Sequence, residues 1–208
     1  MSIKRYEIGP LATNCYLFID DKTNCAVVID PAFESEKLIE DIKQVDLKYI
    51  LLTHAHADHI MGVHKLKQLT GAKIVAHENE EKRLRSKEAN LYSALGCYLD
   101  DYVGYDVDIK VTDGEIIEFG EKVIQILYTP GHTDGSVCYV CGDIIFSGDT
   151  LFYNSYGRTD FDTGNFSQII DSFYKLTLLE GDYAVYSGHG EATSLERERQ
   201  FNPLARFI

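Results

Sequence analysis

The chain has 208 residues, of which 45% are hydrophobic, and this content predicts one globular domain over residues 1–208. Its formal net charge of −13 argues against a nucleic-acid partner, because phosphate binding requires basic patches. A polar N-terminus, an odd number of five cysteines and the lack of a bilayer-length apolar run predict a cytoplasmic protein that does not enter a membrane.

Apolar runs and one-sided apolar stripes predict alternating strands and helices. Short apolar runs bounded by turn residues predict strands, and apolar side chains at helical spacing predict helices that face the core. In chain order these are a strand at 26–29, a helix at 35–45, a strand at 49–52, a helix at 59–69 stopped by Gly71, strands at 73–76, 123–128 and 143–146, a helix at 166–178 and a strand at 183–186.

A dense group of candidate metal ligands follows the strand predicted at 49–52. The stretch THAHADH contains His54, His56, Asp58 and His59. Imidazole nitrogen and carboxylate oxygen are ligands that a divalent ion such as zinc accepts. Because alternate residues of an extended chain point the same way, His54 and His56 can converge on one ion. Asp58 and His59, where the chain turns into a helix, can face a second. This density of ligands argues against a solvated histidine-rich loop.

Three later strand ends each supply one more candidate ligand. His132, Asp149 and His189 follow the strands predicted at 123–128, 143–146 and 183–186, and each comes directly after a glycine. A glycine lets the backbone turn sharply and aim the next side chain at the strand end. Each of these motifs alone is compatible with an ordinary turn, but with THAHADH they form one ordered set.

The ordered set resembles the metallo-β-lactamase-fold hydrolases, and within them the short glyoxalase II-like (hydroxyacylglutathione hydrolase-like) proteins. The resemblance also covers the stretches at 13–17, 28–31, 157–161 and 196–203. It implies an α/β fold, a four-layer αβ/βα sandwich with the metals at one edge between two sheets. It implies one ion held by His54, His56 and His132, a second held by Asp58, His59 and His189, and Asp149 bridging both. His64 and His77 fall outside this set.

The resemblance further implies two divalent metal ions, with zinc favoured and iron or manganese as alternatives. Such a pair converts a shared water to hydroxide and polarises an acyl carbonyl, so no serine or cysteine nucleophile is required. We therefore expect a hydrolase of a small-molecule thioester such as S-hydroxyacylglutathione, with Asp58 also orienting the hydroxide. The five cysteines need no catalytic role and are read as small buried hydrophobic residues: Cys15, Cys25, Cys97, Cys138 and Cys141.

Two other functions compete with this one. A mono-iron persulfide dioxygenase of the same fold shares much of the motif set, including GRTDF, although the ending SGHGEAT is more similar to the short hydrolases. A non-catalytic metal-binding protein is disfavoured because all seven ligand positions are filled. The sequence leaves the oligomeric state open.

Residues beside the ligands have candidate supporting roles. Asp30, at the end of the strand at 26–29, is a candidate to hydrogen-bond a ligating imidazole, and Thr53 and Thr133 are weaker candidates. The polar segment 78–105 is expected to cover one side of the site. Its tyrosines are Tyr92, Tyr98, Tyr102 and Tyr105.

Substrate contacts are predicted in the loop after Asp149. By the resemblance, Arg158 occupies the position of a basic residue that contacts glutathione, but it could equally pair with Asp160 or Asp162. Tyr153 and Tyr156 flank the same loop and are candidates to line the substrate pocket.

Overall fold

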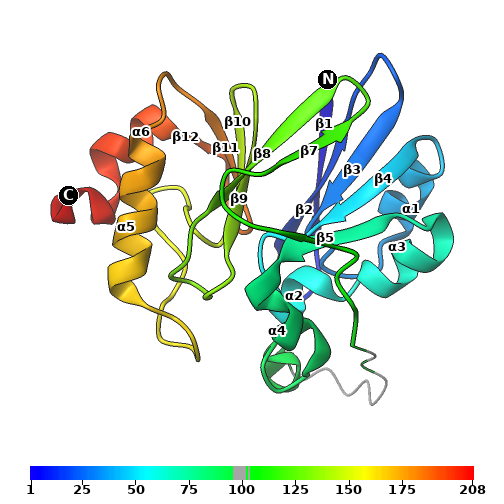
Figure 1. Ribbon diagram of the computed structural model, residues 1–208, viewed down its shortest axis with the longest axis horizontal. Coiled ribbons are helices and arrows are strands. Elements are labelled where there is room, and N and C mark those ends of the chain that lie inside the picture. Colours follow the sequence, from blue (N-terminus) through cyan, green and yellow to red (C-terminus); the bar gives the residue numbers. More distant parts are fainter. Residues whose placement is uncertain (96–101, 103) are drawn as a thin grey trace.

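Two six-stranded sheets pack face to face in the part of the chain that the computed structural model describes, residues 1–95, 102 and 104–208 (Figure 1). The first sheet has the order β1 (Ser2–Ile8), β2 (Thr13–Ile19), β3 (Cys25–Ile29), β4 (Asp46–Leu51), β5 (Lys73–His77) and β6 (Ile109–Val111). The second has the order β12 (Thr193–Ser194), β11 (Ala184–Ser187), β10 (Ile144–Gly148), β9 (Val137–Cys141), β8 (Lys122–Tyr128) and β7 (Ile116–Phe119).

Both sheets are mixed. In the first, β1, β2 and β3 pair antiparallel, and β3, β4, β5 and β6 pair parallel. In the second, β10 and β11 pair parallel, and the other neighbours pair antiparallel. Because parallel strands end at the same edge of a sheet, the residues that follow β3 and β4 are brought together, as are those that follow β10 and β11.

Helices cover the outer face of each sheet (Figure 1). The α-helices are α1 (Glu36–Ile42), α2 (Ala57–Ile60), α3 (Val63–Thr70), α4 (Glu81–Arg85), α5 (Phe166–Thr177) and α6 (Leu195–Phe201), and the 3-10 helices are η1 (Glu78–Glu80), η2 (Tyr92–Leu95) and η3 (Pro203–Phe207). Side-chain oxygens of Ser35 and Asn165 accept backbone hydrogen bonds at the starts of α1 and α5, as N-caps do. α1 and α3 lie on the first sheet, and α5 and α6 on the second.

The hydrophobic core has three layers. Side chains of β2 point alternately to its two faces and so contribute to two of these layers. Tyr16 and Phe18 are buried between the two sheets, whereas Cys15 and Leu17 on the opposite face are buried with the residues of α1 and α3. A third cluster packs α5 and α6 on the second sheet. Helix, sheet, sheet and helix therefore succeed one another, and the predicted four-layer sandwich is confirmed.

The single helix predicted at 59–69 is wrong, because the chain forms two helices, α2 and α3, around Met61 and Gly62. The backbone N–H of Gly62 donates to the carbonyl oxygen of Pro31 at 2.7 Å, and a Cβ at Gly62 would lie 2.7 Å from that oxygen. This close approach holds the start of α3 against the loop after β3. The predicted stop at Gly71 is confirmed by its left-handed φ of 70°.

The cysteines that the structure describes are free thiols. Cys15, Cys138 and Cys141 are buried and Cys25 is half-buried, as expected for small hydrophobic residues. Cys97 and Tyr98 lie outside the described residues. Over the described ranges, no helix has the length and apolar character needed to cross a bilayer.

Candidate metal centre

The seven predicted ligands come from loops that meet at one edge of the sandwich. The loop between β4 and α2 carries His54 and His56, and α2 itself carries Asp58 and His59. The remaining three follow strands of the second sheet: His132 after β8, Asp149 after β10 and His189 after β11. The centre thus spans the gap between the two sheets.

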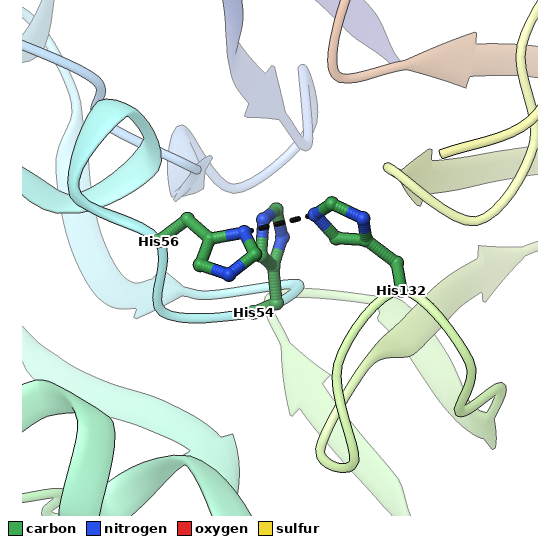
Figure 2. A group of neighbouring side chains, drawn as sticks. All are labelled: His54, His56 and His132. Atoms are coloured by element: carbon green, nitrogen blue, oxygen red, sulfur yellow. Dashed lines mark hydrogen bonds between the residues drawn. The ribbon is translucent and has the colours of Figure 1, made fainter. Parts of the chain in front are cut away.

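His54, His56 and His132 form one group, here called the first triad. Each offers a ring nitrogen, and these atoms lie within 4.8 Å of one another. Figure 2 shows the three rings converging, with His56 Nδ1 2.9 Å from His132 Nε2. All three side chains are buried.

Asp58, His59 and His189 form a second group, the second triad, whose ligand atoms also lie within 4.8 Å of one another. Asp58 Oδ2 is 3.3 Å from His189 Nε2 and 3.6 Å from His59 Nε2. Asp58 and His59 both come from the short α2, and His189 reaches them from the loop after β11.

Asp149 lies between the two triads. Its Oδ2 is 3.5 Å from His132 Nε2 of the first triad and 3.6 Å from His189 Nε2 of the second. Its Oδ1 is 3.4 Å from His59 Nε2. One carboxylate therefore touches members of both groups.

The chemistry of these atoms fits divalent metal ions. Among the described residues, His54 Nε2, His59 Nε2 and Asp149 Oδ1 are buried without a hydrogen-bond partner. Buried polar atoms are normally paired, since an unpaired one costs the free energy of its lost hydration. Nitrogen and carboxylate oxygen donors aimed at shared points would be paired by a borderline ion such as zinc.

Burial and neighbouring charges act on the protonation of these groups in opposite directions. Burial lowers the pKa of His54 and of His56 well below the usual range, so both rings are neutral and keep a lone pair for an ion. Burial opposes ionisation of Asp149, but the nearby positive charge of His59 outweighs it and lowers the pKa of Asp149. Burial likewise opposes the charging of His59, yet Asp58 and Asp149 raise its pKa well above the ordinary value.

Asp30 contacts the imidazole of His59, which is one of the predicted ligands. Its Oδ2 accepts from His59 Nδ1 at 3.0 Å and from the Thr53 hydroxyl at 2.6 Å, and its Oδ1 accepts from Thr53 N at 2.8 Å. Asp30 also lies near His54, but its oxygens are already used by these donors, so it is better described as an acceptor than as a ligand. The bond to Nδ1 leaves His59 Nε2 facing the cluster.

Main-chain oxygens fix two further rings. His132 Nδ1 donates to Arg158 O at 2.8 Å, and His189 Nδ1 donates to Leu11 O at 3.2 Å. Thr53 Oγ1 lies 3.2 Å from His54 Nδ1. Within the described part of the chain, the hydroxyl of Thr133 bonds to Glu80 and Ser136 instead of to a ligating imidazole.

Two of the three glycines before the later ligands adopt a left-handed backbone. Gly131 has φ 135° and Gly148 has φ 49°, as the turn prediction requires. Gly188 is needed for space instead: a Cβ there would lie 2.3 Å from Asp149 Oδ1 and 2.7 Å from His59 Cε1. Its role is close packing against the ligands.

A cavity of about 640 Å³ opens onto the centre. Besides members of both triads and Asp149, its walls include Leu11, Leu91, Phe152, Phe161 and Arg158. Leu91 comes from segment 78–105, so the described part of that segment does cover one side of the site. The walls are mainly apolar.

Of the three predicted substrate-binding residues, Arg158 lines the cavity and the two tyrosines do not. Arg158 lines the cavity, but its guanidinium donates to both carboxylate oxygens of Asp160 at 2.7 and 2.6 Å. Neither predicted tyrosine is among the described residues that line this cavity, but Tyr153 lines a neighbouring pocket together with Phe152 and His189. Tyr156 packs against Phe166, and Tyr153 lies under the guanidinium of Arg197. Aromatic contact with the cavity comes from phenylalanines in the same loop.

Three residues that support the centre were missed by the sequence reasoning. Thr13 Oγ1 donates to Asp58 Oδ2 at 3.3 Å, and Asn14 Nδ2 donates to Ser187 O and Gly190 O on either side of His189. Glu80 is fully buried beside the first triad. Its surroundings in the sequence are polar, so only the tertiary structure reveals it.

Comparisons with known proteins agree with this geometry. The family model described as the metallo-beta-lactamase superfamily matches residues 8–189. The hydroxyacylglutathione hydrolase GloC of Haemophilus influenzae is 33% identical over 98% of this chain and 98% of its own length.

Solved structures are also similar to this chain. The BLEG-1 B3 metallo-beta-lactamase superposes with a TM-score of 0.88 at 32% identity, over 97% of this chain and 98% of that one. The ETHE1 of Myxococcus xanthus superposes at 0.77 with 33% identity, over 98% and 84%. TTHA1623, solved in a di-iron-bound form, superposes at 0.84 with 30% identity, over 99% and 100%.

Proposed function

The chain belongs to the metallo-beta-lactamase superfamily, and from this premise we propose that it is a binuclear metal-dependent hydrolase of thioesters. The candidate substrate is an S-hydroxyacylglutathione. The observation that carries the proposal is the presence of two groups of three candidate ligands, with Asp149 between them, beside a cavity that members of both groups line. The name of the Haemophilus influenzae relative supports the choice of substrate.

In this proposal, one divalent ion would be held by His54, His56 and His132 and the second by Asp58, His59 and His189, and Asp149, which lies between the two groups, would serve both. Zinc suits this set of nitrogen and oxygen donors, while the di-iron form of TTHA1623 makes iron a serious alternative. When bound, the ions supply Lewis acidity that lowers the pKa of a water and polarises the acyl carbonyl.

The chain's own residues orient the reactants. Asp58 lies at the cavity wall, where its Oδ2 is held by Thr13 and His189, so its carboxylate can accept a hydrogen bond from the attacking water. The apolar walls formed by Phe152 and Phe161 receive the acyl group and exclude bulk water. Arg158, at the rim, binds a carboxylate of the thiol part in competition with Asp160.

The alternative is a mono-iron persulfide dioxygenase of the same fold. It requires one ion for each chain and consumes oxygen, whereas the hydrolase requires water alone. The complete second triad favours two ions, because a single-ion enzyme has no need for Asp58, His59 and His189 to converge.

The direct test is the hydrolysis of S-lactoylglutathione by the purified protein reconstituted separately with zinc, iron and manganese. Metal-stripped protein serves as the control. Turnover that disappears on chelation and returns with two equivalents of metal supports the thioesterase. Oxygen uptake with glutathione persulfide, by a form holding one iron and inactive on the thioester, establishes the dioxygenase instead.

A further inference from the structure

Glu80 is a buried carboxylate next to the first triad that has no place in the ligand set. It ends η1, directly after β5, and its side chain is fully buried. An unpaired carboxylate in such a position would be strongly disfavoured, because its charge loses hydration. The contacts that compensate this cost therefore indicate what Glu80 does.

Its two oxygens reach both of the loops that carry the first triad. Glu80 Oε2 accepts from the backbone N–H of Ala55, at 3.1 Å, between His54 and His56 in the chain. Glu80 Oε1 accepts from the hydroxyl of Thr133, at 2.5 Å, immediately after His132. The loop of the first sheet that carries His54 and His56 and the loop of the second sheet that carries His132 are thus joined through one side chain.

Neighbouring residues hold this carboxylate in place. The guanidinium of Arg83 donates to Glu80 Oε2, and its other nitrogen donates to Asp134 Oδ1 at 2.9 Å and to Thr163 Oγ1 at 2.7 Å. A Cβ at Gly135 would lie 2.5 Å from Glu80 Oε1, so glycine leaves the space that the carboxylate needs. Asp134 and Gly135 belong to the same loop as His132. The contact of Arg83 with Asp134 is therefore a second connection between Glu80 and this loop.

We propose that Glu80 is a positioning residue that sets the distance between His132 and the pair His54 and His56, and so sets the affinity for the first ion. This inference rests on the proposed metal centre but not on the identity of the substrate. In the described structure, no residue of the second triad donates a hydrogen bond to Glu80. Removing the hydrogen bond between Thr133 and Glu80 should therefore lower the affinity for the first ion and not for the second.

The test is the stepwise affinity for zinc, measured by competition with a chromophoric chelator, together with the visible spectrum of the cobalt-loaded protein. Thr133→Val removes the hydroxyl that joins the two loops but keeps the Glu80–Arg83 ion pair. It should weaken binding of the ion at the first triad by about tenfold, the lower end of the loss seen when a hydrogen bond to a ligand itself is removed, and change the cobalt spectrum. Thr133→Ser keeps the hydroxyl and should restore both readouts.

Glu80→Ala should have the same effect, but it removes the buried carboxylate partner of Arg83 and leaves that charge with Asp134 alone, which threatens folding, so Thr133→Val carries the test. Glu198→Ala is the matched control. Glu198 is also fully buried, but it accepts hydrogen bonds from Asn154, Thr193 and Asn202, which do not line the cavity. It should leave the affinity of the folded protein for zinc unchanged.

An unaltered first-ion affinity and cobalt spectrum in folded Thr133→Val would overturn the proposal. An equal loss at both triads would also overturn it and make Thr133 a residue of general stability. Because neither readout involves the thioester, a protein that binds two ions with the expected pattern but does not hydrolyse S-lactoylglutathione would refute the proposed substrate alone.

Discussion

Replacing Asp30 by asparagine tests how the second triad is oriented. Asp30 has φ 47°, a backbone conformation that asparagine tolerates better than alanine, so the substitution should leave the main chain in place. The N–H of Thr53 must donate to an oxygen and therefore holds the asparagine oxygen at the position of Oδ1. The new amide NH2 then faces the Thr53 hydroxyl, which can rotate to accept, and His59 Nδ1.

The consequence falls on His59. A neutral imidazole carries one N–H, and an amide donor at Nδ1 moves that proton to Nε2, the atom that faces Asp58 and Asp149. The asparagine can keep both hydrogen bonds to Thr53, but it can hydrogen-bond His59 Nδ1 only if the imidazole changes its tautomer. Loss of such an outer partner costs about 10- to 100-fold in metal affinity, or about 1.4–2.8 kcal/mol. We expect this loss for the second ion, with the first ion little affected.

The assay is competition for zinc against a chromophoric chelator, with thermal unfolding of the metal-free variant to confirm that it is folded. Asp20→Asn is a matched control, because Asp20 is also buried and accepts from the Thr23 hydroxyl and the N–H of Glu121, far from any ligand. If Asp30→Asn binds both ions as tightly as the wild type, Asp30 does not orient His59 and the reasoning fails.

Other substitutions test the remaining parts of the centre. Asp149→Ala should lose both ions and all activity, measured by metal analysis and thioester hydrolysis, and a variant that keeps two ions would refute the bridging role. Arg158→Ala should raise KM about tenfold for glutathione thioesters, the worth of one charge-assisted contact, but leave KM for a small neutral thioester unchanged; equal effects would limit Arg158 to its pairing with Asp160. Gly131→Ala should lower the Tm of the metal-free protein, because φ is 135° and a Cβ would lie 2.4 Å from Ile169 N, and an unchanged Tm would contradict this account. Chelation should lower the Tm of the wild type, since free zinc at about 100 times Kd contributes about 2.7 kcal/mol to the folded state; equal Tm values with and without zinc would show that folding and metal binding are not linked.

Much of the fold follows from local patterns that the chain itself carries. Apolar runs of four to six residues located six of the strands, and helical apolar stripes located α1 and α5 with small errors at their ends. The helix predicted at 59–69 failed at Gly62 because its break is caused by a contact with Pro31, which is distant in the sequence. The spacing of apolar residues within a segment carries no information about a contact with a distant residue.

The predicted ligand set could also be read from the sequence, because its members follow strands that end at one edge of the sandwich. THAHADH and the three glycine-preceded residues His132, Asp149 and His189 carry that information in their own spacing. Asp30 was predictable for the same reason, as a carboxylate at the end of a strand beside β4. Its bond to His59 confirms the position.

Other features around the predicted ligands depend on tertiary structure. Tyr153 and Tyr156 lie in the expected loop, yet packing turns one toward Arg197 and the other toward Phe166, and phenylalanines line the cavity in their place. Glu80 sits in a run of charged residues typical of a solvated helix, and it is buried because two loops from different sheets close over it. The identity of a ligand is a local property of the chain, whereas the direction of a side chain and the burial of a charge depend on contacts between distant segments.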